Sequence, residues 1–171
     1  MNLLSRLFRS SPDPREALRA LWHRTVEIAR EPQWYADCGV ADTVPGRFDM
    51  ITAVLSLVLL RLEDAGRGKD AALLTEFFVE DMDGQLRESG VGDIVVGKHI
   101  GRLMESLGGR LDAFRRSFAA DDRAALEKAL DRNITFNEGT EPGALAERLQ
   151  ALRQGLAETD TDALVAGRIE R

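Results

Sequence analysis

One apolar stretch, Ile51 to Leu60, constrains the fold of this chain more than any other part of the sequence. Only Thr52 and Ser56 interrupt it, and its apolar residues surround nearly the whole circumference of a helix. A helix that crosses a bilayer needs about 20 such residues, so this stretch is too short to span a membrane. It therefore predicts a central helix that is buried on all sides within a helical bundle.

Further helical patterns surround this stretch in a chain of 171 residues, a length typical of one domain. Leu, Ala, Arg and Glu are plentiful, whereas aromatic residues make up only 6%, and this composition favours helix over strand. We expect an all-α, single-domain bundle of about six to eight helices over residues 13–168, preceded by a tail over residues 1–12. The expected helices cover residues 14–31, 45–64, 69–87, 93–118, 121–133, 144–156 and 161–166.

The segments between these helices carry weaker signals. Residues 33–46 predict a structured linker in which Trp34 and Tyr35 fill the edge of the core. Residues 133–136 are the one weak candidate for a strand. Asp121 is expected to cap the helix that follows it, because an Asp side chain at this position accepts a hydrogen bond from a free backbone N–H.

Charge and residue counts exclude several classes of protein. The net charge of −6 argues against a protein whose main partner is nucleic acid, since such binding depends on a basic surface. A single cysteine, Cys38, cannot form an intramolecular disulfide. With only His23 and His99 as further soft ligands, a zinc or iron site of the usual ligand type is not expected.

Residues 81–110 join two expected helices through a charged segment rich in glycine. Within it, residues 92–98 match the G-x-x-x-x-G-K pattern of phosphate-binding loops. His99 stands where such a loop needs Ser or Thr, and the segment before the motif predicts a helix rather than a strand. We therefore predict no nucleotide site here.

The glycines of this segment predict two helices joined by a bend. Gly90 suits the left-handed position that ends a helix, and Asp93 suits the N-cap of the next one. Gly97 and Gly101 lie four residues apart on one helix face, a spacing that predicts the close approach of a neighbour.

The acidic side chains of the same segment predict a solvated or salt-bridged surface. They alternate with cations, and Asp83 with Arg87 has the i,i+4 spacing of a helical ion pair. The spacing of a calcium loop is missing, and no Ser-His-Asp or nucleophile-elbow pattern occurs. We therefore expect no enzyme activity, no cofactor and no metal. The carboxylates concerned are Glu80, Asp81, Asp83, Glu88 and Asp93.

The first ten residues allow two interpretations. Four apolar side chains fall on one helical face, with Arg6 and Arg9 beside them, as in a segment that rests on an anionic membrane surface. The alternative is a frayed terminus that ends at Pro12 and Pro14. The apolar residues are Leu3, Leu4, Leu7 and Phe8.

Three segments, in order, resemble signatures of the ubiquinol–cytochrome c chaperone family. The first is Gly39-Val40-x-Asp42-Thr43-x-x-Gly46-Arg47-Phe48-Asp49. The second is Asp83-x-x-Leu86-Arg87-Glu88-x-Gly90-Val91-Gly92-Asp93-x-x-Val96-Gly97-Lys98, followed by Gly109-Arg110, and the third is Leu130-x-Arg132-Asn133. Two positions depart from the family pattern: Val54 replaces a histidine, and Leu107-Gly108 replace aromatic residues before Gly109-Arg110.

This resemblance implies a mostly helical assembly factor for respiratory complex III. Mitochondrial members bind newly made cytochrome b, act near the ribosomal exit and work with a small helper protein. Since no long presequence is visible, the resemblance implies a bacterial relative in the cytoplasm, peripheral to the inner membrane. A lipid- or quinone-binding peripheral membrane module remains the alternative function.

The resemblance also implies which residues serve the function. Partner-binding residues are expected among the charged positions Arg47, Asp83, Arg87, Glu88, Asp93, Lys98 and Arg110. Structural roles are expected for Gly39, Asp42, Gly46, Phe48, Gly90, Gly92 and Gly97. In the alternative interpretation, the charged residues too only fix the geometry of the helices.

Overall fold

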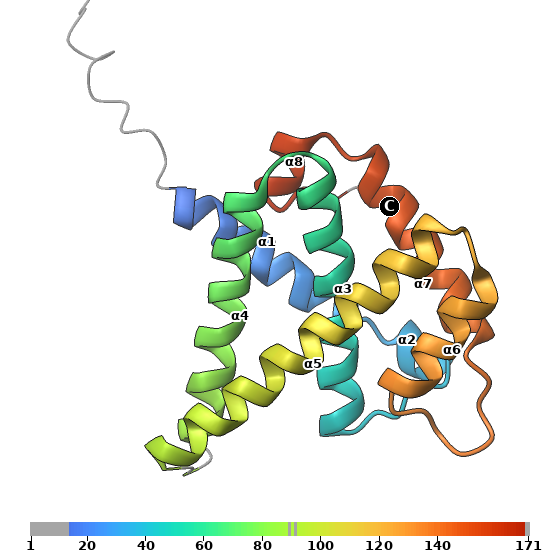
Figure 1. Cartoon of the computed structure of the whole chain (residues 1–171), viewed down its shortest axis with the longest axis horizontal. Helices are drawn as coiled ribbons and strands as arrows, with labels where there is room; N and C mark the ends of the chain where they lie inside the picture. The colour runs from blue at the N-terminus through green and yellow to red at the C-terminus, as the bar shows by residue number, and fades with distance from the viewer. Residues whose placement is uncertain (1–13, 89, 91, 170–171) are drawn as a thin grey trace, which may run out of the picture.

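Helices joined by turns and loops build the described part of the chain, which in this computed structural model comprises residues 14–88, 90 and 92–169 (Figure 1). This confirms the predicted all-α bundle. The helices are α1 (Pro14–Ala29), α2 (Gln33–Ala36), α3 (Val44–Asp64), α4 (Gly68–Glu88), α5 (Asp93–Ala119), α6 (Arg123–Asn133), α7 (Gly143–Glu158) and α8 (Thr161–Val165).

The helix α3 is the centre of the bundle, as its apolar sequence predicts. Every residue from Met50 to Leu59 is buried, and α3 packs against α1, α4, α5 and α7. Its two buried hydroxyls are satisfied within the helix: Thr52 donates to the carbonyl oxygen of Asp49 (2.9 Å), and Ser56 to that of Thr52 (2.7 Å). The polar interruptions therefore do not prevent burial of the helix.

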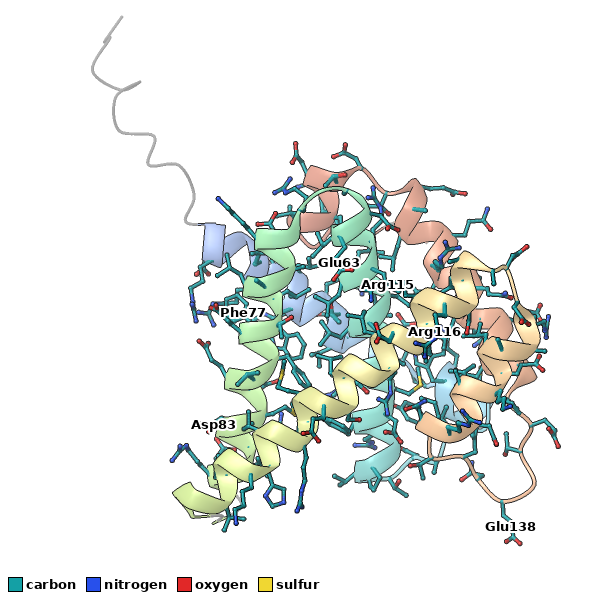
Figure 2. The ribbon with its side chains drawn as sticks, viewed as in Figure 1. Glu63, Phe77, Asp83, Arg115, Arg116 and Glu138 are labelled. Atoms are coloured by element: carbon teal, nitrogen blue, oxygen red, sulfur yellow. The ribbon has the colours of Figure 1, made fainter. Side chains whose placement is uncertain are left out.

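The outer helices cover α3 from several sides. The helix α4 runs beside it, α5 crosses it diagonally, and α6 and α7 lie at the far end of α5 (Figure 1). Aromatic contacts close the core between α1, α3 and α4, where the ring centroid of Phe78 lies 6.1 Å from that of Trp22 and 6.3 Å from that of Phe48. On the surface, Arg115 of α5 reaches Glu63 of α3 at 2.7 Å (Figure 2).

The corner between α4 and α5 is the predicted bend. Gly90 has φ +79°, a conformation that L-residues rarely adopt and that ends α4. The N-cap of α5 is Gly92 rather than Asp93, which is the first residue of the helix. The predicted close approach at Gly97 and Gly101 is wrong, because a Cβ at either position would meet no atom of a neighbouring element within 4 Å among the described residues.

Three local predictions differ in detail from the structure. The N-cap of α6 is Asp122, which accepts from the backbone N–H of Ala125 (2.9 Å), whereas Asp121 sits before it with φ +48°. The weak strand candidate contributes only an isolated bridge between Phe136 and Val40. The predicted linker contains the short helix α2, whose pattern is too short to be detected in the sequence.

Trp34 of α2 fills the core as predicted. Its side chain is 1% exposed, and its indole Nε1 donates to the carbonyl oxygen of Ile28 at 2.6 Å. Tyr35 is half-buried and donates to the carbonyl oxygen of Ala29 at 2.9 Å. The short helix is thereby tied to the end of α1.

The predicted membrane-contacting residues Leu3, Leu4, Leu7 and Phe8 lie outside the described residues, as does the tail over 1–12. Among the helices that the structure describes, none has the length and apolar character needed to cross a membrane.

Candidate functional site

A buried ion pair joins segments that lie far apart in the sequence. Arg110 of α5 is 3% exposed, and its Nη2 lies 3.1 Å from Oδ1 of Asp49 on α3. The same guanidinium donates to the carbonyl oxygens of Asp49 (3.2 Å) and Asn133 (2.6 Å). These three residues come from the three segments of the family resemblance, so all three segments meet at this point.

The carboxylate of Asp49 completes this connection. Its Oδ2 accepts from the backbone N–H of Thr135 at 2.9 Å and from the Thr135 hydroxyl at 2.7 Å. Asp49 thus ties the start of α3 both to α5 and to the segment after α6. We call Arg110, Asp49, Asn133 and Thr135 the arginine lock.

Burial lowers the pKa of the Arg110 guanidinium, and Asp49 opposes that shift. Arginine nevertheless stays charged in proteins, so the lock contains a real ion pair. Loss of one partner from a buried pair is strongly unfavourable, because it leaves the other charge uncompensated. The geometry therefore favours a positioning role for Arg110, whose side chain is only 3% exposed.

The loop before α3 is shaped by Gly46. A Cβ at this position would lie 2.0 Å from the carbonyl oxygen of Ala41, so only glycine fits without movement of the backbone. Thr43 caps the helix by accepting from the Gly46 N–H at 3.3 Å. This turn carries Arg47 at the surface, where its Nε bonds Asp42 at 2.6 Å.

The ion pair between Asp42 and Arg47 is exposed to solvent. The hydrogen bond from Arg47 lowers the pKa of the Asp42 carboxyl, and the same bond raises the pKa of Arg47. Both groups are therefore charged at neutral pH.

An open, mostly apolar groove lies between the start of α3, the end of α4 and the middle of α5. Its volume is about 610 Å³. Val44, at its edge, is 84% exposed although it is a large apolar residue. We call this the α3–α4–α5 groove; it is lined by Val44, Pro45, Phe48, Ile51, Met82, Leu86 and Leu103, with Arg30, Arg47 and Gln85 as polar members. Apolar grooves of this kind receive amphipathic or apolar helices.

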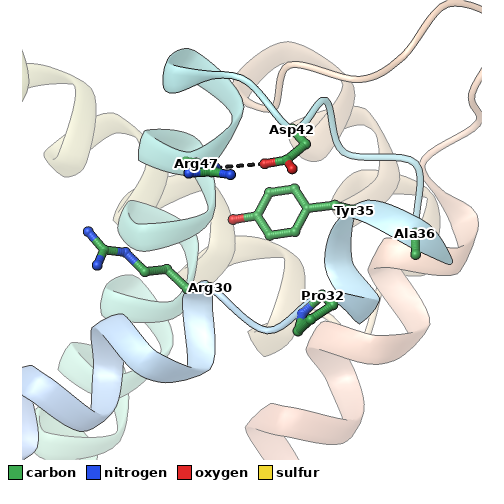
Figure 3. Close-up of a pocket in the computed structure, with 6 residues that line it drawn as sticks. All are labelled: Arg30, Pro32, Tyr35, Ala36, Asp42 and Arg47. Carbon is green, nitrogen blue, oxygen red and sulfur yellow. Dashed lines mark hydrogen bonds and ion pairs between the residues drawn. The ribbon is translucent and has the colours of Figure 1, made fainter.

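A second hollow of about 550 Å³ adjoins the groove (Figure 3). It is lined by Arg30, Pro32, Tyr35, Ala36, Asp42 and Arg47, so it shares both arginines with the groove. Figure 3 shows the Tyr35 phenol on the side of the two arginines. Burial raises the pKa of Tyr35, so its hydroxyl is neutral at physiological pH.

The remaining predicted partner residues lie around the α4–α5 corner rather than inside the groove. Arg87 pairs with Asp83 at 2.7 Å near the end of α4 (Figure 2). Glu88 and Lys98 are exposed, and Asp93 begins α5. Among the predicted partner residues whose side chains the structure describes, only Arg47 lines the groove.

Sequence reasoning missed Arg30 and the apolar walls as a site. Met82 and Leu86 are recognisable in the sequence as the inward face of a helix, but Leu86 remains half-buried beside the groove. No pattern within a single helix reveals that α3, α4 and α5 leave a space between them. Among the described residues, no group of three or more His, Cys, Asp and Glu side chains could hold a metal ion.

The structure is an all-α domain with an open, mostly apolar groove between α3, α4 and α5. The chain belongs to the ubiquinol-cytochrome C chaperone family, whose model matches residues 36–171. A similar solved structure is the crystal structure of the Cbp3 homolog from Brucella abortus. It is 31% identical, with a TM-score of 0.81, over 98% of this chain and 95% of that chain. No match was found among curated proteins.

Proposed function

We propose that this protein is a non-enzymatic assembly chaperone that binds newly made cytochrome b and supports the biogenesis of respiratory complex III. Membership of the chaperone family supports the general role. The α3–α4–α5 groove is the observation that supports an apolar client, since its walls are mostly apolar side chains and Val44 at its edge is largely exposed.

In this proposal the groove takes an apolar helix of the client, as in other helix-in-groove complexes. The charged residues Asp83, Arg87, Glu88 and Lys98 of the corner, with Asp93 and Arg47, form a polar rim that orients it. Arg110 acts through the arginine lock, which fixes α5 against α3 and so sets one wall of the groove.

The proposed place of action is the cytoplasmic face of the inner membrane of a bacterium. The tail over residues 1–12 is proposed to rest on the lipid surface through its apolar face. A ribosome exit region and a small helper protein are further proposed partners, on the basis of the family resemblance.

A strain that lacks the protein tests this function. We expect less assembled complex III, while other respiratory enzymes persist, and restoration by the wild-type chain. Blue-native electrophoresis and the spectrum of haem b measure both. Normal complex III in the deletion strain contradicts the proposal.

One observation supports a second candidate, a lipid- or quinone-binding module. The groove volume of about 610 Å³ falls within the range of small-molecule pockets. Mass spectrometry of the protein purified from membranes tests this: a stoichiometric lipid or quinone supports the module, and its absence from protein that still binds the client contradicts it.

A further inference from the structure

We propose that the α3–α4–α5 groove selects apolar helices that carry a carboxylate, and that Arg30 and Arg47 bind this carboxylate. The inference rests on the proposed function, since it takes an apolar client segment as the occupant of the groove. It adds a requirement on the chemistry of that segment.

The two arginines stand where the apolar groove meets the adjoining hollow. Arg30 follows the end of α1 and Arg47 belongs to the first turn of α3, so two different elements bring the cations to one place. Both residues line the groove and the adjoining hollow, and these two hollows share no other lining residue. An occupant at this edge of the groove therefore lies beside both arginine residues.

These guanidinium groups retain hydrogen-bonding capacity. Within the described ranges, no carboxylate lies within ion-pair distance of Arg30. Arg47 uses its Nε for Asp42, which leaves its terminal amino groups for a second acceptor. The planar fork of an arginine matches a carboxylate, so the free donors fit this group.

The need for such a contact comes from the occupant. A carboxylate within an apolar membrane-protein helix is costly in apolar surroundings unless a cation accompanies it. A groove that is apolar along its walls and cationic at one edge lowers this cost while the client is unassembled. An apolar helix without a carboxylate gains only the burial of its apolar surface in the groove.

The charges around the groove favour a peptide over an anionic bilayer. The chain carries a net charge of −6, and the corner beside the groove is not basic overall, because Asp83 and Glu88 balance Arg87 and Lys98. An anionic membrane surface gains little from such a balanced face, whereas a single carboxylate in the groove meets only the local arginines. We therefore assign the arginines to a peptide carboxylate and not to a lipid headgroup.

Binding of two matched helical peptides to the full-length protein tests the inference. Both have leucines at positions i, i+3, i+4 and i+7; one carries a single Glu beside this face and the other Gln. We expect the Glu peptide to bind about three- to tenfold more tightly, a size typical of one or two partly exposed charge pairs. The preference should shrink in about 0.5 M salt, because salt screens such pairs.

Variants of the protein show which residues cause the preference for the Glu peptide. The double variant Arg30→Gln/Arg47→Gln should lose the preference for the Glu peptide. Asp42→Asn should enlarge this preference, because it removes the carboxylate that Arg47 binds in the free protein. Arg116→Gln is the matched control, since Arg116 is an exposed arginine 13 residues beyond Leu103 on α5, about 20 Å along the helix. A circular-dichroism melt of each variant shows that the fold is intact.

Equal affinity of the wild-type protein for the two peptides overturns the inference, as does a preference that survives in the double variant. If Leu86→Ser then weakens both peptides equally, the groove still binds apolar helices and the proposed function stands without the carboxylate. If neither peptide binds, the groove is not a helix site and the inference fails, whereas the deletion strain decides the proposed function independently. Selective binding of phosphatidylglycerol vesicles that the double variant abolishes, without a peptide preference, assigns the arginines to lipid and overturns the inference.

Discussion

At the scale of single residues, Arg110 illustrates what a sequence pattern can and cannot decide. Its position after Gly109 identifies it as part of a family signature, but an arginine on a helix is usually exposed. Its burial depends on Asp49 and on the Asn133 carbonyl, which are 61 and 23 residues away. The role of such a residue follows only from its tertiary partners.

We predict that Arg110→Ala lowers the free energy of unfolding by about 2–4 kcal/mol, because it leaves the half-buried Asp49 carboxylate without its cation and the Asn133 carbonyl oxygen without its donor. Urea denaturation measures this change. Lys98→Ala is the control, since Lys98 is exposed and its removal should change stability by less than about 0.5 kcal/mol. Similar small effects of both substitutions would contradict the structural role of the lock.

The carboxyl of Asp42 supplies a prediction on pH. Its pKa is lowered in the folded protein by the hydrogen bond from Arg47, so the pair is present at neutral pH and is lost as the pH falls through the lowered pKa. In Arg47→Gln, NMR titration should show this pKa returning towards its ordinary value. An unchanged pKa would mean that Arg47 does not hold the carboxylate in solution.

At the scale of the elements, periodicity was sufficient to predict most helices. The apolar stretch predicted α3, and Gly90 predicted the turn after α4, because both signals are local. The boundary errors at Asp93 and Asp121 arise because adjacent residues compete for one cap. The helix α2 has only four residues and therefore no detectable period.

Substitution by alanine should change stability in opposite directions at a crowded glycine and at a glycine in open space. Gly46→Ala should lower the free energy of unfolding by about 1–3 kcal/mol, because its Cβ would overlap the Ala41 carbonyl oxygen. Gly97→Ala should raise it by about 0.5–1 kcal/mol, because open space surrounds this helical position. Thermal or urea unfolding measures both. Changes of the same sign would contradict the assigned local geometry.

At the scale of the whole molecule, the arrangement of the helices creates the groove. Individual wall residues such as Met82 and Leu86 have the pattern of an ordinary core face, so the sequence predicts them as buried. Whether a face is fully covered depends on the angle at which α5 crosses α3 and α4 (Figure 1). The fold class was therefore predictable, whereas the site required the tertiary structure.

Val44→Asp should impair assembly of complex III without unfolding the chaperone. The side chain is 84% exposed at the start of α3, where an acidic residue also suits the helix dipole. We expect stability within about 0.5 kcal/mol of wild type and less assembled complex III in complemented deletion cells. Ala124→Asp, exposed in the first turn of α6, is the matched control and should complement fully. Full complementation by both would exclude Val44 from the client surface.

Site-specific photo-crosslinking in living cells tests the client and its binding surface together. A photoreactive amino acid is placed at position 44, at the edge of the groove, and at position 124 on α6 as the control. We predict an adduct with newly made cytochrome b from position 44 and none from position 124. Adducts only with unrelated soluble proteins, or equal cytochrome b adducts from both positions, would contradict the assignment of the α3–α4–α5 groove as the client site.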